Sequence, residues 1–83
     1  MAIEISLFGF GDERPAAFGG GNRLALAAPA PMSPDALLRA AGFDETEGLV
    51  LIIDDAVIPA ADWQRPLIDD GTAVTVLSAF EGG

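Results

Sequence analysis

The chain closes with Thr72-Ala73-Val74-Thr75-Val76-Leu77-Ser78-Ala79-Phe80-Glu81-Gly82-Gly83. Its first part alternates and is rich in β-branched residues, so we predict a final strand with Val74 and Val76 facing inward. Thr75 and Leu77 then face outward. Because glycine lacks a Cβ, a Gly-Gly end can enter a narrow channel with its carboxylate unshielded. We therefore expect an exposed tail at 78–83. Either its terminal carboxylate takes part in a reaction, or the tail is a frayed end without a function.

The composition is that of a small globular domain that lacks the side chains most used in catalysis. The 83 residues suffice for one domain, residues 1–83, which removes about 60% of the unfolded chain's surface from water. Apolar residues make up 51% of the chain and charged residues 20%, as in folded proteins. Cysteine and histidine are absent, which removes thiolates and the commonest general base. We expect a protein that is not itself an enzyme, with no bound metal or cofactor.

The charge narrows the possible partners. The formal charge of −9 comes from 13 acidic and 4 basic residues, which argues against nucleic acid and anionic membranes because both reward basic surfaces. Steering toward a basic protein and simple solubility both fit this charge. No segment reaches the roughly 18 to 20 apolar residues of a membrane helix. The start, Met1-Ala2-Ile3-Glu4, lacks the pattern of a signal peptide, so we expect a cytoplasmic location.

Alternation and turn residues divide the upstream chain into short elements. Ile3, Ile5 and Leu7 are predicted to share the buried face of a first strand, which leaves Phe8 on the opposite face. The other predicted elements are a loop at 9–22, a second strand at 23–28, a helix at 34–41, a strand at 49–53 buried on much of both faces, a turn at Asp54-Asp55 and a short strand at 57–58.

The helix has sequence signals at both ends. Ser33-Pro34-Asp35 combines a serine N-cap, a proline at the first helical position and an acid at the positive end of the helix dipole. Leu37 and Leu38 form the apolar stripe, and Gly42 supplies a left-handed C-cap. Such a helix must cover one face of a sheet.

The order of elements predicts an α+β fold. A mixed four- or five-stranded sheet packed on one main helix, the ubiquitin-like β-grasp architecture, is the economical arrangement. Phe10 and Phe18 in the long loop are expected to fold back on the domain, and Trp63 is expected to be a packing anchor.

Four stretches carry a family resemblance that covers nearly the whole chain. They are Ile3-Glu4-Ile5-Ser6-Leu7-Phe8, Ser33-Pro34-Asp35-Ala36-Leu37-Leu38, Leu51-Ile52-Ile53-Asp54-Asp55-Ala56-Val57-Ile58-Pro59, and Leu67-Ile68-Asp69-Asp70-Gly71-Thr72-Ala73-Val74 running on to Gly82-Gly83. These stretches resemble the ThiS/MoaD family of ubiquitin-like sulfur carriers. The acidic Asp-Gly turn, followed by one strand and a terminal Gly-Gly, is the most specific part of the likeness.

The resemblance implies chemistry on the tail. The carboxylate of Gly83 would be adenylated by an E1-like adenylyltransferase, which supplies the ATP and Mg²⁺. A sulfur donor, either a cysteine desulfurase or a rhodanese, would convert it to a thiocarboxylate that passes sulfur to an acceptor synthase. Gly82 would let the tail thread into the partner's channel. The expected partner contacts are Phe8, Leu77, Phe80 and Glu81.

Two acceptor pathways fit the resemblance. Ile58-Pro59 followed by Asp62-Trp63 is similar to the thiamine-thiazole carriers, which use thiazole synthase and which we favour. The long first loop and the Leu7-Phe8 start are similar to the small subunit of molybdopterin synthase. Glu81 differs from both groups, which usually place a small or aliphatic residue there. The alternative function is a ubiquitin-like modifier joined to lysines through Gly83, or an interaction module that does not use the tail.

Overall fold

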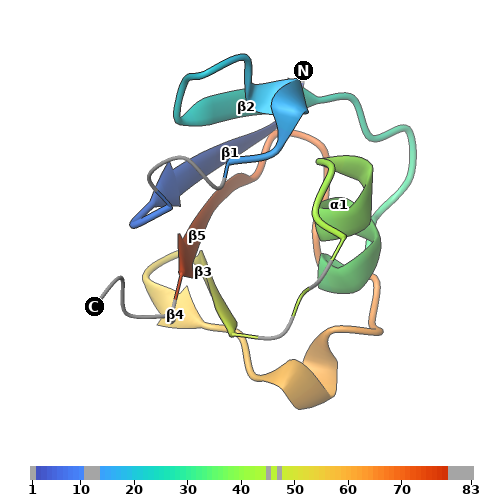
Figure 1. The fold of residues 1–83 in the computed structure, drawn as a ribbon. Coiled ribbons are helices and arrows are strands. Elements are labelled where there is room, and N and C mark those ends of the chain that lie inside the picture. The colour runs from blue at the N-terminus through green and yellow to red at the C-terminus, as the bar shows by residue number, and fades with distance from the viewer. Residues whose placement is uncertain (1, 11–13, 45, 47, 79–83) are drawn as a thin grey trace.

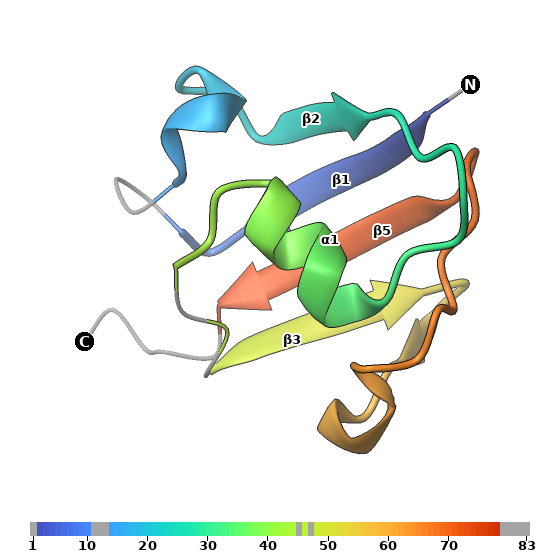
Figure 2. The same ribbon diagram turned by 90° about the vertical axis from the view of Figure 1, so that its right-hand side faces the viewer.

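The computed structural model describes residues 2–10, 14–44, 46 and 48–78, which form an α+β fold. Figures 1 and 2 show a sheet with a helix packed across one of its faces. The strands are β1 (Ile3–Phe8), β2 (Arg23–Leu26), β3 (Leu49–Ile53), β4 (Ala56–Val57) and β5 (Ala73–Ser78). The helix is α1 (Pro34–Ala40), and short 3₁₀ helices are η2 (Ala16–Phe18) and η3 (Ala60–Asp62).

The last strand, β5, lies at the centre of the sheet. The strand order is β2-β1-β5-β3-β4, with β5 parallel to β1 and antiparallel to β3. The outer pairs, β1 with β2 and β3 with β4, are antiparallel. The sheet is therefore mixed and has five strands, within the predicted range of four or five. Strands from opposite ends of the described chain pair directly.

The core lies between one face of the sheet and α1. Alternate residues of β1 and β5 point toward the helix, as predicted, and Leu37 and Leu38 of α1 are fully buried against them. Burial of each large apolar side chain contributes roughly 1.5–3 kcal/mol to folding. The strand residues that form this face, none more than 2% exposed, are Ile3, Ile5, Leu7, Val74 and Val76.

Both ends of α1 are closed by the signals in the sequence. Ser33 Oγ accepts a hydrogen bond from the Ala36 N–H at 3.1 Å, as expected of an N-cap. The helix stops at Ala40, one residue before the predicted end, and Gly42 adopts a φ of +104°. The Phe43 N–H then donates to a carbonyl of the last helical turn at 3.0 Å, which completes a Schellman motif.

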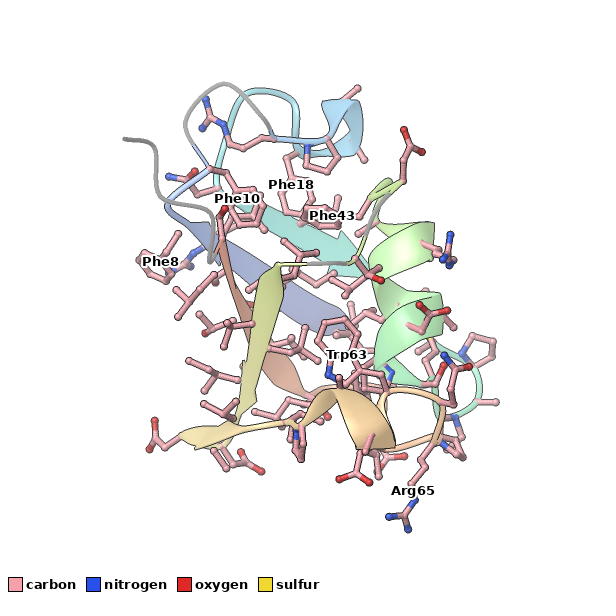
Figure 3. The ribbon with its side chains drawn as sticks, turned by 60° about the horizontal axis from the view of Figure 1, so that its bottom comes forward. Phe8, Phe10, Phe18, Phe43, Trp63 and Arg65 are labelled. Carbon is pink, nitrogen blue, oxygen red and sulfur yellow. The ribbon has the colours of Figure 1, made fainter. Side chains whose placement is uncertain are left out.

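Aromatic side chains tie the long first loop to the end of α1. Phe10 and Phe18 are buried and pack on Phe43, with ring centroids 5.5 Å and 6.2 Å from it. Figure 3 shows the three rings together, on the far side of the sheet from Phe8. The predicted folding back of Phe10 and Phe18 is confirmed. Trp63 is also a packing anchor, since it is 8% exposed and its Nε1 donates to the Ile58 carbonyl at 3.0 Å.

Three strands differ from their predictions. β2 ends at Leu26 rather than at residue 28, and β4 spans Ala56–Val57 rather than 57–58. β3 was predicted to be buried on much of both faces, yet only Leu51 is fully buried. Val50 and Ile52 lie on the face that α1 does not cover, and Leu49 and Ile53, at the two ends of the strand, pack only partly buried against the core. The predicted tight turn after β3 is confirmed: Asp54 and Asp55 have φ of 54° and 65°, the left-handed values of a type I′ turn.

We predict that Gly42→Ala destabilises the domain more than Gly20→Ala. Both glycines have positive φ, +104° and +84°, which costs a side chain roughly 1–2 kcal/mol. A Cβ on Gly42 would also meet Pro15 Cβ at 3.0 Å, whereas nothing lies within 4 Å of a Cβ on Gly20. Urea unfolding of the two variants measures the difference, and equal losses would show that Pro15 moves aside freely.

Candidate functional site

An apolar row crosses the face of the sheet opposite α1. The Cα partners of Leu77 are Phe8 on β1 and Val50 on β3, and paired residues project from the same face of a sheet. Phe8 is 58% exposed, and Leu77 and Val50 are half-buried. Three neighbouring strands therefore present apolar side chains side by side to the solvent.

A second row extends this surface toward β4. Ile52 pairs with Thr75 on one side and with Val57 on the other. Val57 is 61% exposed although it is apolar. We call Phe8, Val50, Ile52, Val57 and Leu77 the outer patch. Contiguous exposed apolar surface of this kind marks contact sites in proteins, whereas single exposed apolar residues do not.

The outer patch continues into a hollow at the β4 edge of the sheet. This hollow, of about 420 Å³, is lined by residues that include Val50, Val57, Pro59 and Trp63. Trp63 forms part of the wall of this hollow, and its indole Nε1 donates a hydrogen bond to the Ile58 carbonyl. At this edge the patch is therefore continued by mostly apolar residues.

One end of the outer patch, formed by Phe8, Leu77 and Val50, lies where β5 ends. Leu77 immediately precedes Ser78, the last residue of β5, and Phe8 is the last residue of the parallel neighbour β1. Because β1 and β5 are parallel, their C-terminal ends lie side by side at the same end of the sheet. β5 therefore ends at Ser78 next to the exposed Phe8 and the half-buried Leu77.

Some of the predicted contact residues lie on this surface. The outward orientation of Phe8 and Leu77 is confirmed by their pairing and exposure. Phe80, Glu81, Gly82 and Gly83 lie outside the described residues. The sequence reasoning missed Val50, Ile52 and Val57. For Val50 and Ile52 the alternation of a strand could have found them only after the face covered by α1 was known, because every second residue of the apolar run 49–53 faces away from that helix.

The described part of the chain shows neither a cluster of potential metal ligands nor a helix that could span a membrane. Among these residues, no three Asp or Glu side chains gather into a group that could hold a metal ion. Asp54 and Asp55 are exposed and occupy the turn between β3 and β4. None of the helices in the described ranges is long and apolar enough to span a bilayer.

Comparisons with known proteins leave the function to be argued from the chain itself. No protein-family model matches the sequence, and a comparison with curated proteins finds no match.

We predict that Phe8→Ala changes the free energy of unfolding by less than about 1 kcal/mol, because exposed side chains contribute little. Leu7→Ala, one residue away, removes a side chain that is 2% exposed and should cost about 2–5 kcal/mol. Denaturant titration of the two variants checks this contrast. A large loss for Phe8→Ala would mean that the outer patch is needed for folding rather than available for contact.

Proposed function

We propose that this chain is a sulfur carrier whose Gly83 carboxylate is adenylated and then converted to a thiocarboxylate. The observation that carries the proposal is the position of the outer patch beside the end of β5, from which the chain continues to Gly82-Gly83. A partner enzyme that binds the outer patch would have the tail of this chain close to the active site of the enzyme. The family resemblance of the sequence supports the same assignment.

The architecture supports a β-grasp fold. Its sheet order places the first and last strands in parallel at the centre, with antiparallel strands outside them and α1 across one face. In this arrangement the carrier's tail follows directly from the most constrained strand. We infer that the folded domain binds the surface of the partner and that only the segment after Ser78 enters the partner's active site.

The composition of the chain indicates that a partner enzyme, and not this chain, activates the Gly83 carboxylate. A carboxylate is a poor electrophile until one of its oxygens becomes a leaving group, and this activation needs a metal ion and positioned donors around ATP. The chain has no histidine and no cysteine. An E1-like adenylyltransferase would therefore bind ATP and Mg²⁺ and activate Gly83, so that the chain is a co-substrate and not the enzyme.

The sulfur step is assigned to further partners. The outer sulfur of a persulfide on a cysteine desulfurase or a rhodanese would attack the activated Gly83 carbonyl and displace AMP, which gives an acyl disulfide. A thiol of the partner would then cleave the S–S bond, be oxidised to a disulfide and release the thiocarboxylate. The thiocarboxylate then serves an acceptor synthase, and we place these steps in the cytoplasm, where ATP is available. Outward Leu77 and Phe8 provide contact for each partner in turn, which explains why one surface has to remain free.

The acceptor is proposed on the sequence. We favour thiazole synthase over the large subunit of molybdopterin synthase because of Ile58-Pro59 and Asp62-Trp63. Trp63 is buried, and its Nε1 donates a hydrogen bond to the Ile58 carbonyl. The similarity to the thiamine-thiazole carriers at these residues therefore concerns packing near β4 and not an exposed partner contact. Glu81 adds a negative charge near the reactive end, which would favour a channel with a basic wall.

We predict that the intact protein isolated from its native host gains mass equal to the replacement of one oxygen by sulfur. Mass spectrometry with fragmentation should place this change at Gly83. An isopeptide link between Gly83 and a lysine would instead identify a protein modifier. Neither adduct, in cells with active sulfur transfer, would contradict tail chemistry altogether and favour an interaction module.

We also predict that deletion of Gly83 abolishes sulfur transfer in a reconstituted system without lowering the melting temperature. Among the described residues of β5 the last core residue is Val76, seven positions before Gly83, so we expect the deletion to leave the core intact. Leu77→Ala should weaken partner binding about tenfold, since loss of a well-packed contact residue costs more than 1 kcal/mol. Unchanged affinity would contradict the assignment of the outer patch as the docking surface.

A further inference from the structure

The hollow at the β4 edge exists because β4 is too short to cover β3. β4 pairs with residues 52–53 of β3, and the chain then turns at Pro59 into η3. Leu49 and Val50, in the first half of β3, form one wall of the hollow, and the segment after β4, with Pro59 and Trp63, forms the other. Its volume of about 420 Å³ falls within the range of small-ligand pockets, roughly 300–1,000 Å³, so its size suits one aromatic side chain.

The lining of this hollow selects an uncharged, apolar group. The described residues that line it carry no charge. Thr46 supplies a hydroxyl, and the Trp63 N–H is already donated to the Ile58 carbonyl. Val57 lines the same hollow and is 61% exposed, so covering it would remove apolar surface from water. The site therefore favours a hydrocarbon or aromatic side chain and disfavours a carboxylate.

The segment that follows β5 begins beside this hollow. Ser78, the last residue of β5, pairs with Leu49, which lines the hollow. Neighbouring strands lie about 5 Å apart, whereas two extended residues span up to about 7 Å. The Cα atom of Phe80, which lies outside the described residues, is therefore within reach of the far side of β3. Its side chain can extend from there into the hollow.

The sequence of the tail offers one side chain that fits this lining. The chain continues after Ser78 as Ala79-Phe80-Glu81-Gly82-Gly83, in which Phe80 is the only large apolar residue. The route is open as well, because Gly48, next to Leu49, lines the hollow and has no side chain. A glycine allows another backbone to pass closely. The pairing of β5 with β3 therefore leads the tail past a position that leaves room for it.

We propose that the hollow at the β4 edge binds Phe80 of the same chain when no partner holds the tail. The ring packs between Val50 and Val57 and meets the edge of Trp63, where an aromatic pair adds to the burial of apolar surface. Glu81 and the Gly83 carboxylate stay in water, because the lining offers no charge to either of them. The docked segment is therefore short and ends at Phe80.

Attachment to β5 favours this occupant over a second copy of the chain. A group joined to its site by a short linker has an effective concentration in the millimolar range, so even a weak contact is occupied within one chain. Two separate copies, each with a charge of −9, repel each other instead. Under the proposed function, which this consequence requires, a partner must draw Phe80 out of the hollow before Gly83 enters its active site.

Nuclear Overhauser spectra of the full chain, labelled in its valine methyl groups, test the docking without any partner or ATP. Wild type should show cross-peaks from the Phe80 ring to the methyl groups of Val50 and Val57, and Phe80→Leu should remove these ring signals. Phe8→Ala is the matched control, because it deletes an exposed ring that lies well apart from Trp63 (Figure 3). This control should keep the cross-peaks. The result stands whether or not Gly83 is converted to a thiocarboxylate.

A change in the wall of the hollow tests the site from the other side. Val57→Asp places a charge against the ring and should remove the cross-peaks between Phe80 and Val50, while circular dichroism stays unchanged because Val57 is exposed. A Phe80 ring without cross-peaks to the hollow, or with cross-peaks to Leu77 instead, would overturn the proposal. Cross-peaks that appear only between labelled and unlabelled copies in a mixed sample would overturn it too, since they would identify a second copy as the occupant.

Discussion

The parallel pairing of β1 with β5 is the contact on which the rest of the domain depends. It joins the β2–β1 pair to a strand that also holds β3 and, through β3, the short strand β4. Without β5 the sheet would consist of two two-stranded pieces, which are marginal in water on their own. Closing the chain between β1 and β5 costs loop entropy that grows slowly with length. Burial of Val74 and Val76 against α1 offsets that cost.

Local features of the fold were predictable because each depends on a few adjacent residues. The serine cap of α1, the left-handed Gly42 and the Asp54-Asp55 turn all lie where the sequence indicates. Alternation also identified the buried faces of β1 and β5. The position of β5 in the sheet was not predictable, because alternation tells which face of a strand is buried and not which strand lies beside it.

The candidate site was predictable in part, for the same physical reason. Phe8 and Leu77 stand out because the residues that precede them on the same face of their strands, Glu4, Ser6 and Thr75, are polar. Val50 and Ile52 do not stand out, since the run Leu49–Ile53 is apolar at every position and its two faces look alike in the sequence. Only the observation that α1 covers a single face separates them. From the sequence alone, the role of Gly83 is suggested only by the family resemblance, because no packing pattern reports on a reactive carboxylate.

The central position of β5 has a mechanical consequence. A pull on the chain beyond Ser78 acts along β5, and β5 is bonded on one side to β1 and on the other to β3. The load is parallel to both neighbours, so the hydrogen bonds of the two ladders resist it together in shear instead of opening one after another. An edge strand such as β4 could be peeled away from its single neighbour. A partner can therefore draw the tail tightly into a channel while the domain that carries it stays folded.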